Sequence, residues 1–129
     1  MACVSGSLGG HFSSQKPLWP VVHFLKKEVK KAAKAKQAGE IEHIVVATHY
    51  VPTKEHYPEI YLDSPLNEAF AQDLTDFIVS NPIDYWIYGH HHFNQPDFKV
   101  GNTQLLTNQL GYVVRDEHEG FDWGKYIEI

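Results

Sequence analysis

Two short apolar runs, each ending at a histidine, constrain the fold of this chain most strongly. The run 41–48 leads directly into His49, and the run 83–88 leads through Gly89 into His90. Runs of this length that are apolar almost throughout are typical of strands covered on both faces, as in parallel sheets. Open α/β sheets bind ligands beyond the carboxyl ends of their strands. We therefore expect an α/β fold that brings the two histidine positions to one sheet edge.

Two amphipathic segments predict helices. Over 18–37, apolar residues recur every three or four positions, and Gly39 follows as a stop signal. Over 64–80, Ser64 predicts an N-cap and Pro65 the first helical position, ahead of an apolar stripe. A helix between the two strands gives the order of a βαβ unit, in which both strand ends reach the same edge.

The two ends of the chain differ in character. Residues 1–17 are rich in glycine and serine without periodicity, which predicts an irregular lead-in. Phe98-Lys99-Val100 and the run 103–107 flank Gly101-Asn102, which predicts a β-hairpin and a C-terminal part that is mainly β. A length of 129 residues suits one domain, which we assign to residues 18–129.

The composition favours an ordinary globular protein. Hydrophobic residues make up 43% of the chain and charged residues 21%, and no apolar stretch is long enough to span a bilayer. The first ten residues lack the pattern of a secretory signal, and the single cysteine cannot form an internal disulfide. We expect no membrane partner and a cytoplasmic location.

The net charge of −5 conceals an asymmetry, because residues 1–40 carry seven lysines and only two acidic residues. A basic run of this kind could bind nucleic acid or anionic lipid, but lysines on an amphipathic helix more often form its solvent-exposed face. We adopt the second interpretation and do not expect a nucleic-acid partner. Six of these lysines fall within the predicted helix: Lys26, Lys27, Lys30, Lys31, Lys34 and Lys36.

The histidine triplet at 90–92 has the spacing of a metal-binding element. In an extended strand His90 and His92 share one face and His91 points to the other. Together with His49, the pair could hold one metal ion in a three-histidine zinc site, or could give one ligand to each of two metals. A solvent-exposed turn without a ligand is the remaining possibility.

Three segments resemble the C-terminal half of calcineurin-like metallophosphoesterases. Val45-Val46-Ala47-Thr48-His49-Tyr50-Val51-Pro52, Ser64-Pro65-Leu66-Asn67 and Asp84-Tyr85-Trp86-Ile87-Tyr88-Gly89-His90-His91-His92 stand in the family's order. Gly101-Asn102-Thr103, Asn108 and Gly111-Tyr112 are similar to its final strands. The resemblance covers roughly residues 40–113.

The resemblance implies a β-sandwich flanked by helices, of which 18–129 is the C-terminal half, and hydrolysis of phosphate mono- or diesters at two divalent metals (Mn, Fe or Zn). His49 and His90 would then be ligands of one metal and His92 a ligand of the other. The metals would clamp the phosphate ester and lower the pKa of a bridging water. The resemblance assigns no catalytic residue within this chain.

Motifs from the family's N-terminal half, including its metal-bridging aspartate, have no counterpart in a suitable place. Asp116-Glu117-His118 has the letters of one of them but follows the histidine triplet, so we expect a surface turn there. Three neutral imidazoles do not offset the charge of two divalent cations. The resemblance thus implies a truncated, split or degenerate enzyme that is inactive or incomplete alone, completed by a homodimer partner or by a complementing N-terminal half.

Two other functions fit the same residues. One is a mononuclear three-histidine zinc hydrolase or lyase. The other is a non-enzymatic interaction module that uses the lysine-rich helix or an uncovered sheet face as its contact surface.

Overall fold

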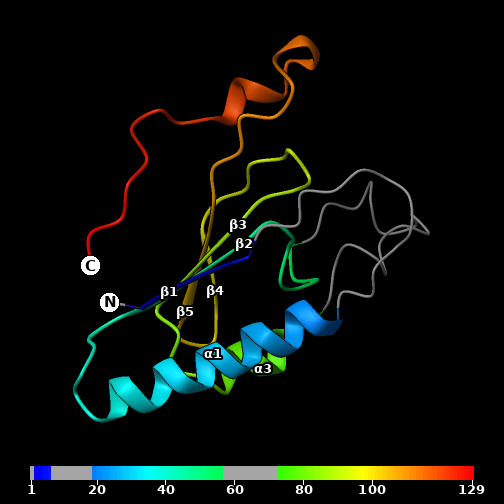
Figure 1. Ribbon diagram of the computed structural model, residues 1–129. Helices are drawn as coiled ribbons and strands as arrows, with labels where there is room; N and C mark the ends of the chain where they lie inside the picture. Colours follow the sequence, from blue (N-terminus) through cyan, green and yellow to red (C-terminus); the bar gives the residue numbers. More distant parts are fainter. Residues whose placement is uncertain (1, 7–18, 57–72) are drawn as a thin grey trace.

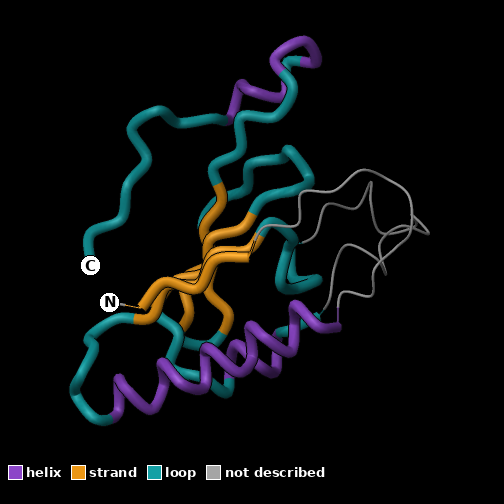
Figure 2. The backbone as a smooth tube through the Cα atoms, in the orientation of Figure 1, coloured by secondary structure: helices purple, strands orange, loops and turns teal. Residues whose placement is uncertain are grey.

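The computed structural model describes residues 2–6, 19–56 and 73–129, which form an α/β arrangement around one sheet. The sheet has five strands in the order β1-β2-β3-β5-β4. Figure 1 shows α1 and α3 together on one face of this sheet, and Figure 2 shows the strands as a single layer. The α/β class predicted from the sequence is confirmed.

Four of the strands run parallel, and they include both predicted histidine-bearing runs. β2 (Ile44–Thr48) pairs with β3 (Tyr85–Tyr88), which in turn pairs with β5 (Thr103–Thr107). β2, β3 and β5 each have a strand on both sides, which satisfies their backbone hydrogen bonds and allows these short apolar runs to be buried. The prediction of a central strand before His49 is confirmed.

The first strand corrects one expectation. Residues 1–17 were expected to be irregular, but β1 (Ala2–Gly6) pairs with β2 in parallel over its whole length. The segment has no strand pattern of its own, so the hydrogen bonds offered by the open edge of β2 determine its conformation. The rest of the expected lead-in, 7–18, lies outside the described residues.

Helix α1 (Trp19–Gln37) forms where its periodicity predicts, and it packs its apolar stripe on the sheet. Leu25, Val29 and Ala32 are buried against core residues of β2, β3 and β5. The helix ends at Gln37, and beyond it the φ of +75° at Gly39 allows Glu40 N–H to donate to the Ala35 carbonyl at 2.9 Å. Four of its lysines are exposed, as the solvent-facing interpretation requires: Lys27, Lys30, Lys31 and Lys34.

The second predicted helix is shorter where the structure describes it. The start expected at Ser64 lies outside the described residues, and α3 spans only Thr75–Val79. Residues 73 and 74 are not helical, and the N–H of Leu74, the residue before α3, donates to the Pro52 carbonyl at 2.8 Å. Ile78 completes the packing of this helix into the core.

The predicted hairpin is confirmed, but the chain after it is not β. β4 (Phe98–Val100) pairs antiparallel with β5 across the two-residue turn Gly101-Asn102. Of these two, Gly101 alone has a positive φ, +58°, the pattern of a type II′ turn. Beyond Thr107 the chain forms loops and two 3₁₀ helices, η2 (Val113–Arg115) and η3 (Glu117–Gly120), so the mainly β expectation is wrong there.

All strands of the described residues belong to this one sheet, so that part of the chain has no second sheet of the expected sandwich. Among the described residues, no helix has both the length and the apolarity to cross a membrane.

Candidate metal centre at the ends of two parallel strands

His49 and His90 meet at the sheet edge where the sequence places them. β2 and β3 are in parallel register with Ala47 beside Ile87, so their following residues leave the sheet together. His49 Nε2 lies 3.2 Å from His90 Nδ1, and the two rings are in edge contact at a centroid distance of 5.1 Å. The predicted convergence of these two histidines is confirmed.

Hydrogen bonds to the core fix the conformation of the turn that carries His49. The hydroxyl of Thr48 accepts a hydrogen bond from the buried Trp86 indole at 2.9 Å and donates to the Tyr50 carbonyl at 2.8 Å. Tyr50 in turn packs its ring against His90 at a centroid distance of 4.6 Å. The His49 carbonyl also accepts the Gly89 N–H at 3.2 Å, which ties the two strand ends together.

The distance between the two ring nitrogens suits a shared cation. Two imidazole nitrogens that each lie about 2.0–2.1 Å from one metal are about 2.9–3.4 Å apart, depending on octahedral or tetrahedral geometry. The 3.2 Å between His49 Nε2 and His90 Nδ1 falls within this interval. In the structure the two nitrogens share a hydrogen bond, so one ring must lose that hydrogen before both can bind the same divalent metal.

His90 is also held in the protonation state that metal binding needs. Burial, followed by the neighbouring imidazoles of His49, His91 and His92, lowers the pKa of His90 to about 4. The ring is therefore neutral at physiological pH, and a neutral imidazole is the form that ligates metals.

The backbone of the triplet differs from the extended strand assumed in the sequence analysis. β3 ends at Tyr88, and His90 and His92 have φ values of +85° and +53°. Positive φ costs a non-glycine residue roughly 1–3 kcal/mol, and such strain is concentrated at functional sites. Gly89 does not take a positive φ, so the strain falls on the two histidines that the sequence assigns to metal binding.

His91 points into the protein, as its predicted opposite orientation requires. The residue is 8% exposed, and its Nδ1 accepts hydrogen bonds from Gln109 Nε2 at 3.1 Å and from Phe93 N–H at 3.2 Å. Burial and the nearby His92 lower the pKa of His91 to about 4. His91 is therefore a structural residue.

His92 lies apart from the His49–His90 pair in its contacts. Its Nδ1 is 3.0 Å from Glu117 Oε2, and its ring packs edge-on against Tyr112. The hydrogen bond from Tyr112 N–H lowers the pKa of Glu117, partial burial opposes this, and the contact with His92 lowers it further. Asp116 is the exposed turn residue that the sequence predicts, and Glu117, which follows it in η3, reaches the histidine site. Over the described ranges, no three His, Cys, Asp or Glu side chains form a group suited to a metal.

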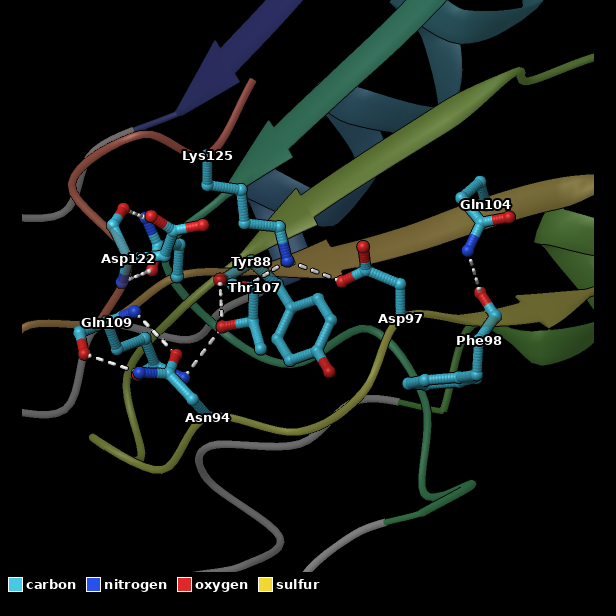
Figure 3. A network of polar contacts seen from close by, with 10 residues as sticks. Tyr88, Asn94, Asp97, Phe98, Gln104, Thr107, Gln109, Asp122 and Lys125 are labelled. Atoms are coloured by element: carbon cyan, nitrogen blue, oxygen red, sulfur yellow. Dashed lines mark hydrogen bonds and ion pairs between the residues drawn. The ribbon is translucent and has the colours of Figure 1, made fainter. Parts of the chain in front are cut away.

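Gln109 organises the triplet, although nothing in the sequence pattern singles it out. Its side-chain oxygen accepts the His92 N–H at 2.8 Å, and its amide nitrogen donates to Thr107 Oγ1 at 2.8 Å as well as to His91. Asn94 clamps the Gln109 backbone, accepting its N–H at 2.6 Å and donating to its carbonyl at 2.8 Å. Figure 3 shows the part of this network formed by Asn94, Thr107 and Gln109. A buried glutamine with this many partners fixes the path of the histidine turn.

A polar cavity of about 440 Å³ lies next to this network, between the end of β5 and the C-terminal segment. Asn108, Asp122 and Lys125 line it, and the Lys125 ammonium pairs with Asp97 and with the Thr107 carbonyl. None of His49, His90 or His92 lines the cavity, so it is separate from the histidine site.

Comparison with known proteins finds one similar sequence of uncharacterised role. No family model matches the chain, and no solved structure matches it. Uncharacterized protein L509 of Acanthamoeba polyphaga mimivirus is 34% identical over 98 residues, which cover 70% of this chain. The chain spans about a third of that relative's length, 34%.

Proposed function

We propose that this chain is the C-terminal half of a metal-dependent phosphoesterase, contributes its histidine ligands, and hydrolyses phosphate mono- or diesters only when it is completed by other groups. The separation of 3.2 Å between His49 Nε2 and His90 Nδ1 is the observation that carries the proposal. Two ring nitrogens at this spacing are suited to one divalent cation, and they stand at the sheet edge where α/β folds bind ligands. The strained backbone at His90 and His92 supports the same site.

The placement of His92 favours two metals over a single three-histidine zinc. In the two-metal proposal His92 serves the second metal, so its nitrogen need not join those of His49 and His90. In the mononuclear alternative all three rings converge on one ion. The contacts of His92 with Glu117 and Tyr112 are easier to reconcile with the first arrangement.

The proposed centre requires groups from outside this set of histidines. Histidines ligate as neutral imidazoles, so carboxylates are needed to offset two divalent charges. Bound metals of this kind polarise the phosphate ester and generate a hydroxide nucleophile near neutral pH. His49, His90 and His92 would hold Mn, Fe or Zn and orient the ester, while the carboxylates come from a complementing segment. The greater length of the mimivirus relative is compatible with such a segment.

An exposed apolar residue on the sheet suggests where a partner would dock. Ile87 belongs to the central strand β3, on the face opposite the buried Trp86 and Tyr88, and it is 38% exposed. Parallel sheets normally have both faces covered. Val45 and Leu106 on the same face are each 6% exposed, so the exposed part of the face is local to Ile87. We propose that a second copy of the chain or the complementing half covers Ile87, in a cytoplasmic setting.

Metal titration tests the proposal. We expect isothermal titration with MnCl₂ or ZnCl₂ to show weak binding by the chain, and His49→Ala and His90→Ala each to abolish it. His23→Ala is the matched control, because His23 is exposed on α1 and should leave binding unchanged. The chain alone should not hydrolyse bis(p-nitrophenyl) phosphate with these metals.

Two outcomes would contradict the proposal. Unchanged metal affinity in both His49→Ala and His90→Ala would show that these histidines do not form a metal site. One tightly held zinc per chain, lost also in His92→Ala, would instead favour the mononuclear hydrolase or lyase. Sequencing the DNA upstream for an in-frame segment with the missing carboxylate motifs would distinguish a truncated enzyme from a degenerate one.

A further inference from the structure

The contact between Glu117 and His92 assigns a role to a carboxylate that the proposed function does not use. We infer that Glu117 is a positioning residue for His92: it accepts the Nδ1 hydrogen and thereby leaves Nε2 as the ring nitrogen with a lone pair for a divalent cation. This inference rests on the proposed function and deepens it, because it specifies how one ligand is prepared.

The geometry determines which ring nitrogen carries the hydrogen. His92 Nδ1 is 3.0 Å from Glu117 Oε2, and the same oxygen accepts the Tyr112 N–H at 2.7 Å. An ionised carboxylate can only accept hydrogen bonds, so the hydrogen of a neutral His92 ring must be on Nδ1. The lone pair is then on Nε2.

His91 shows the opposite arrangement one residue earlier. Its Nδ1 receives two N–H donors, from Gln109 and Phe93, so its hydrogen must be on Nε2. Adjacent histidines are therefore set in different tautomers by their neighbours. The buried ring has its Nδ1 occupied by structural bonds, and the partly exposed ring has its Nε2 left for a ligand.

The local backbone is built to bring Glu117 to His92. Gly111 and Asp116 have φ values of +64° and +58°, and these two left-handed residues fold the segment between them back on the histidine turn. An ideal Cβ placed on Gly111 would lie 2.5 Å from Glu117 Cβ and 3.3 Å from His92 Cβ. Only glycine at 111 lets the carboxylate reach the ring.

The arrangement is the one found around metal-ligating histidines generally. Such a histidine donates its second ring N–H to a carboxylate or carbonyl, which fixes the ring orientation and raises ligand basicity. Loss of such a partner typically lowers metal affinity by about 10–100-fold.

Ring-nitrogen NMR tests the inference without any metal. In the wild-type chain at pH 7.5, two-bond ¹⁵N–¹H correlations should show His92 with its hydrogen on Nδ1. Glu117→Ala should shift the ring toward the Nε2–H tautomer, and Glu117→Gln, whose amide oxygen can still accept, should largely restore the wild-type spectrum. Glu119→Ala is the matched control, because Glu119 lies exposed on the same 3₁₀ helix.

Titration with MnCl₂ then tests the link to metal binding. Glu117→Ala should weaken the affinity of the His92 site by about 10–100-fold, while Glu119→Ala should not. A His92 tautomer that does not respond to Glu117→Ala overturns the inference. An altered tautomer with an unaltered metal affinity overturns the metal-positioning role. Failure of the wild-type chain to bind metal contradicts the proposed function and the metal-positioning role of Glu117. The NMR experiment still shows whether Glu117 determines the tautomer of the His92 ring.

Discussion

The indole N–H of Trp86 donates to the hydroxyl of Thr48 at 2.9 Å, which joins the centre of the core to the turn that carries His49. Trp86 is fully buried on β3, and Thr48 is the last residue of β2. The same hydroxyl donates to the Tyr50 carbonyl, so one side chain serves both the packing of the sheet and the candidate metal centre.

We predict that Thr48→Val lowers the free energy of unfolding by about 1–3 kcal/mol, because the Trp86 N–H is left buried without an acceptor. Thr48→Ser keeps the hydroxyl and should cost less. Urea unfolding followed by tryptophan fluorescence measures both. Equal stability of the Val and Ser variants would show that the hydrogen bond contributes nothing.

We predict that the ion pair of Asp84 makes the free energy of unfolding fall at acidic pH. Its carboxylate accepts hydrogen bonds from the Ile44 N–H and from Lys36, at 2.7 and 2.6 Å. Burial raises the pKa of Asp84, but these bonds outweigh it and hold the pKa below the ordinary 3.8. Because the folded-state pKa is lowered, the stabilisation is present above pH 3.8 and is lost as pH falls through the folded-state value.

We expect the wild-type chain to lose about 1–2 kcal/mol more than Asp84→Asn between pH 6 and pH 2, after allowance for the partial exposure of the pair. Urea unfolding at a series of pH values checks this. At pH 7, Lys36→Gln should destabilise the chain, whereas Lys30→Gln, on the exposed face of α1, should change stability by less than about 0.5 kcal/mol. Parallel pH profiles for wild type and Asp84→Asn would contradict the assignment.

Two glycines near the histidines should respond differently to alanine. At Gly111 the φ is +64° and an added Cβ would meet Glu117 Cβ at 2.5 Å. We predict that Gly111→Ala costs about 1–3 kcal/mol. Gly89 has no positive φ, and its nearest contact would be the His49 carbonyl at 3.6 Å, so Gly89→Ala should leave stability unchanged or raise it by up to about 1 kcal/mol. Thermal unfolding of both variants measures the two changes in stability. A larger loss of stability in Gly89→Ala than in Gly111→Ala would contradict the prediction.

The features that the sequence predicts correctly depend on local pattern or simple strand geometry. The apolar stripe and Gly39 predict α1, and Gly101-Asn102 predicts the turn between β4 and β5. The meeting of His49 and His90 follows from two buried runs in parallel, because parallel strands end at one edge.

The features that it misses depend on contacts between distant segments. β1 is a strand because β2 offers it an unpaired edge. Glu117 lies 25 positions after His92 and reaches it only through the left-handed residues between them, and Gln109 lies 17 positions after it. Neither spacing has a periodicity that a sequence pattern could reveal. The histidine turn itself departs from an extended strand because Gln109 and Asn94 hold it.

Gln109 is expected to be the most sensitive polar residue outside the candidate ligands. Gln109→Leu removes the side-chain partner of the His92 N–H and of the Phe93 carbonyl, and it removes one of the two donors to His91 Nδ1. We predict a loss of about 2–4 kcal/mol and faster amide exchange in the histidine turn. Gln104→Leu is the matched control, because Gln104 gives a single long bond, 3.3 Å, to the Phe98 carbonyl. Similar losses of stability in the two variants would show that Gln109 does not organise the histidine turn.

Ile87 provides the test of the proposed partner. The residue is 38% exposed on the central strand, on the face opposite the core side chains Trp86 and Tyr88. If a second copy covers this face, sedimentation velocity at increasing concentration should show a wild-type dimer. Ile87→Lys should shift it to monomer, since a charge buried in the interface costs several kcal/mol. Val79→Lys changes an equally apolar, 58% exposed residue of α3 and should leave the dimer intact. A wild-type chain that stays monomeric at every concentration would favour the complementing half over a second copy as the partner.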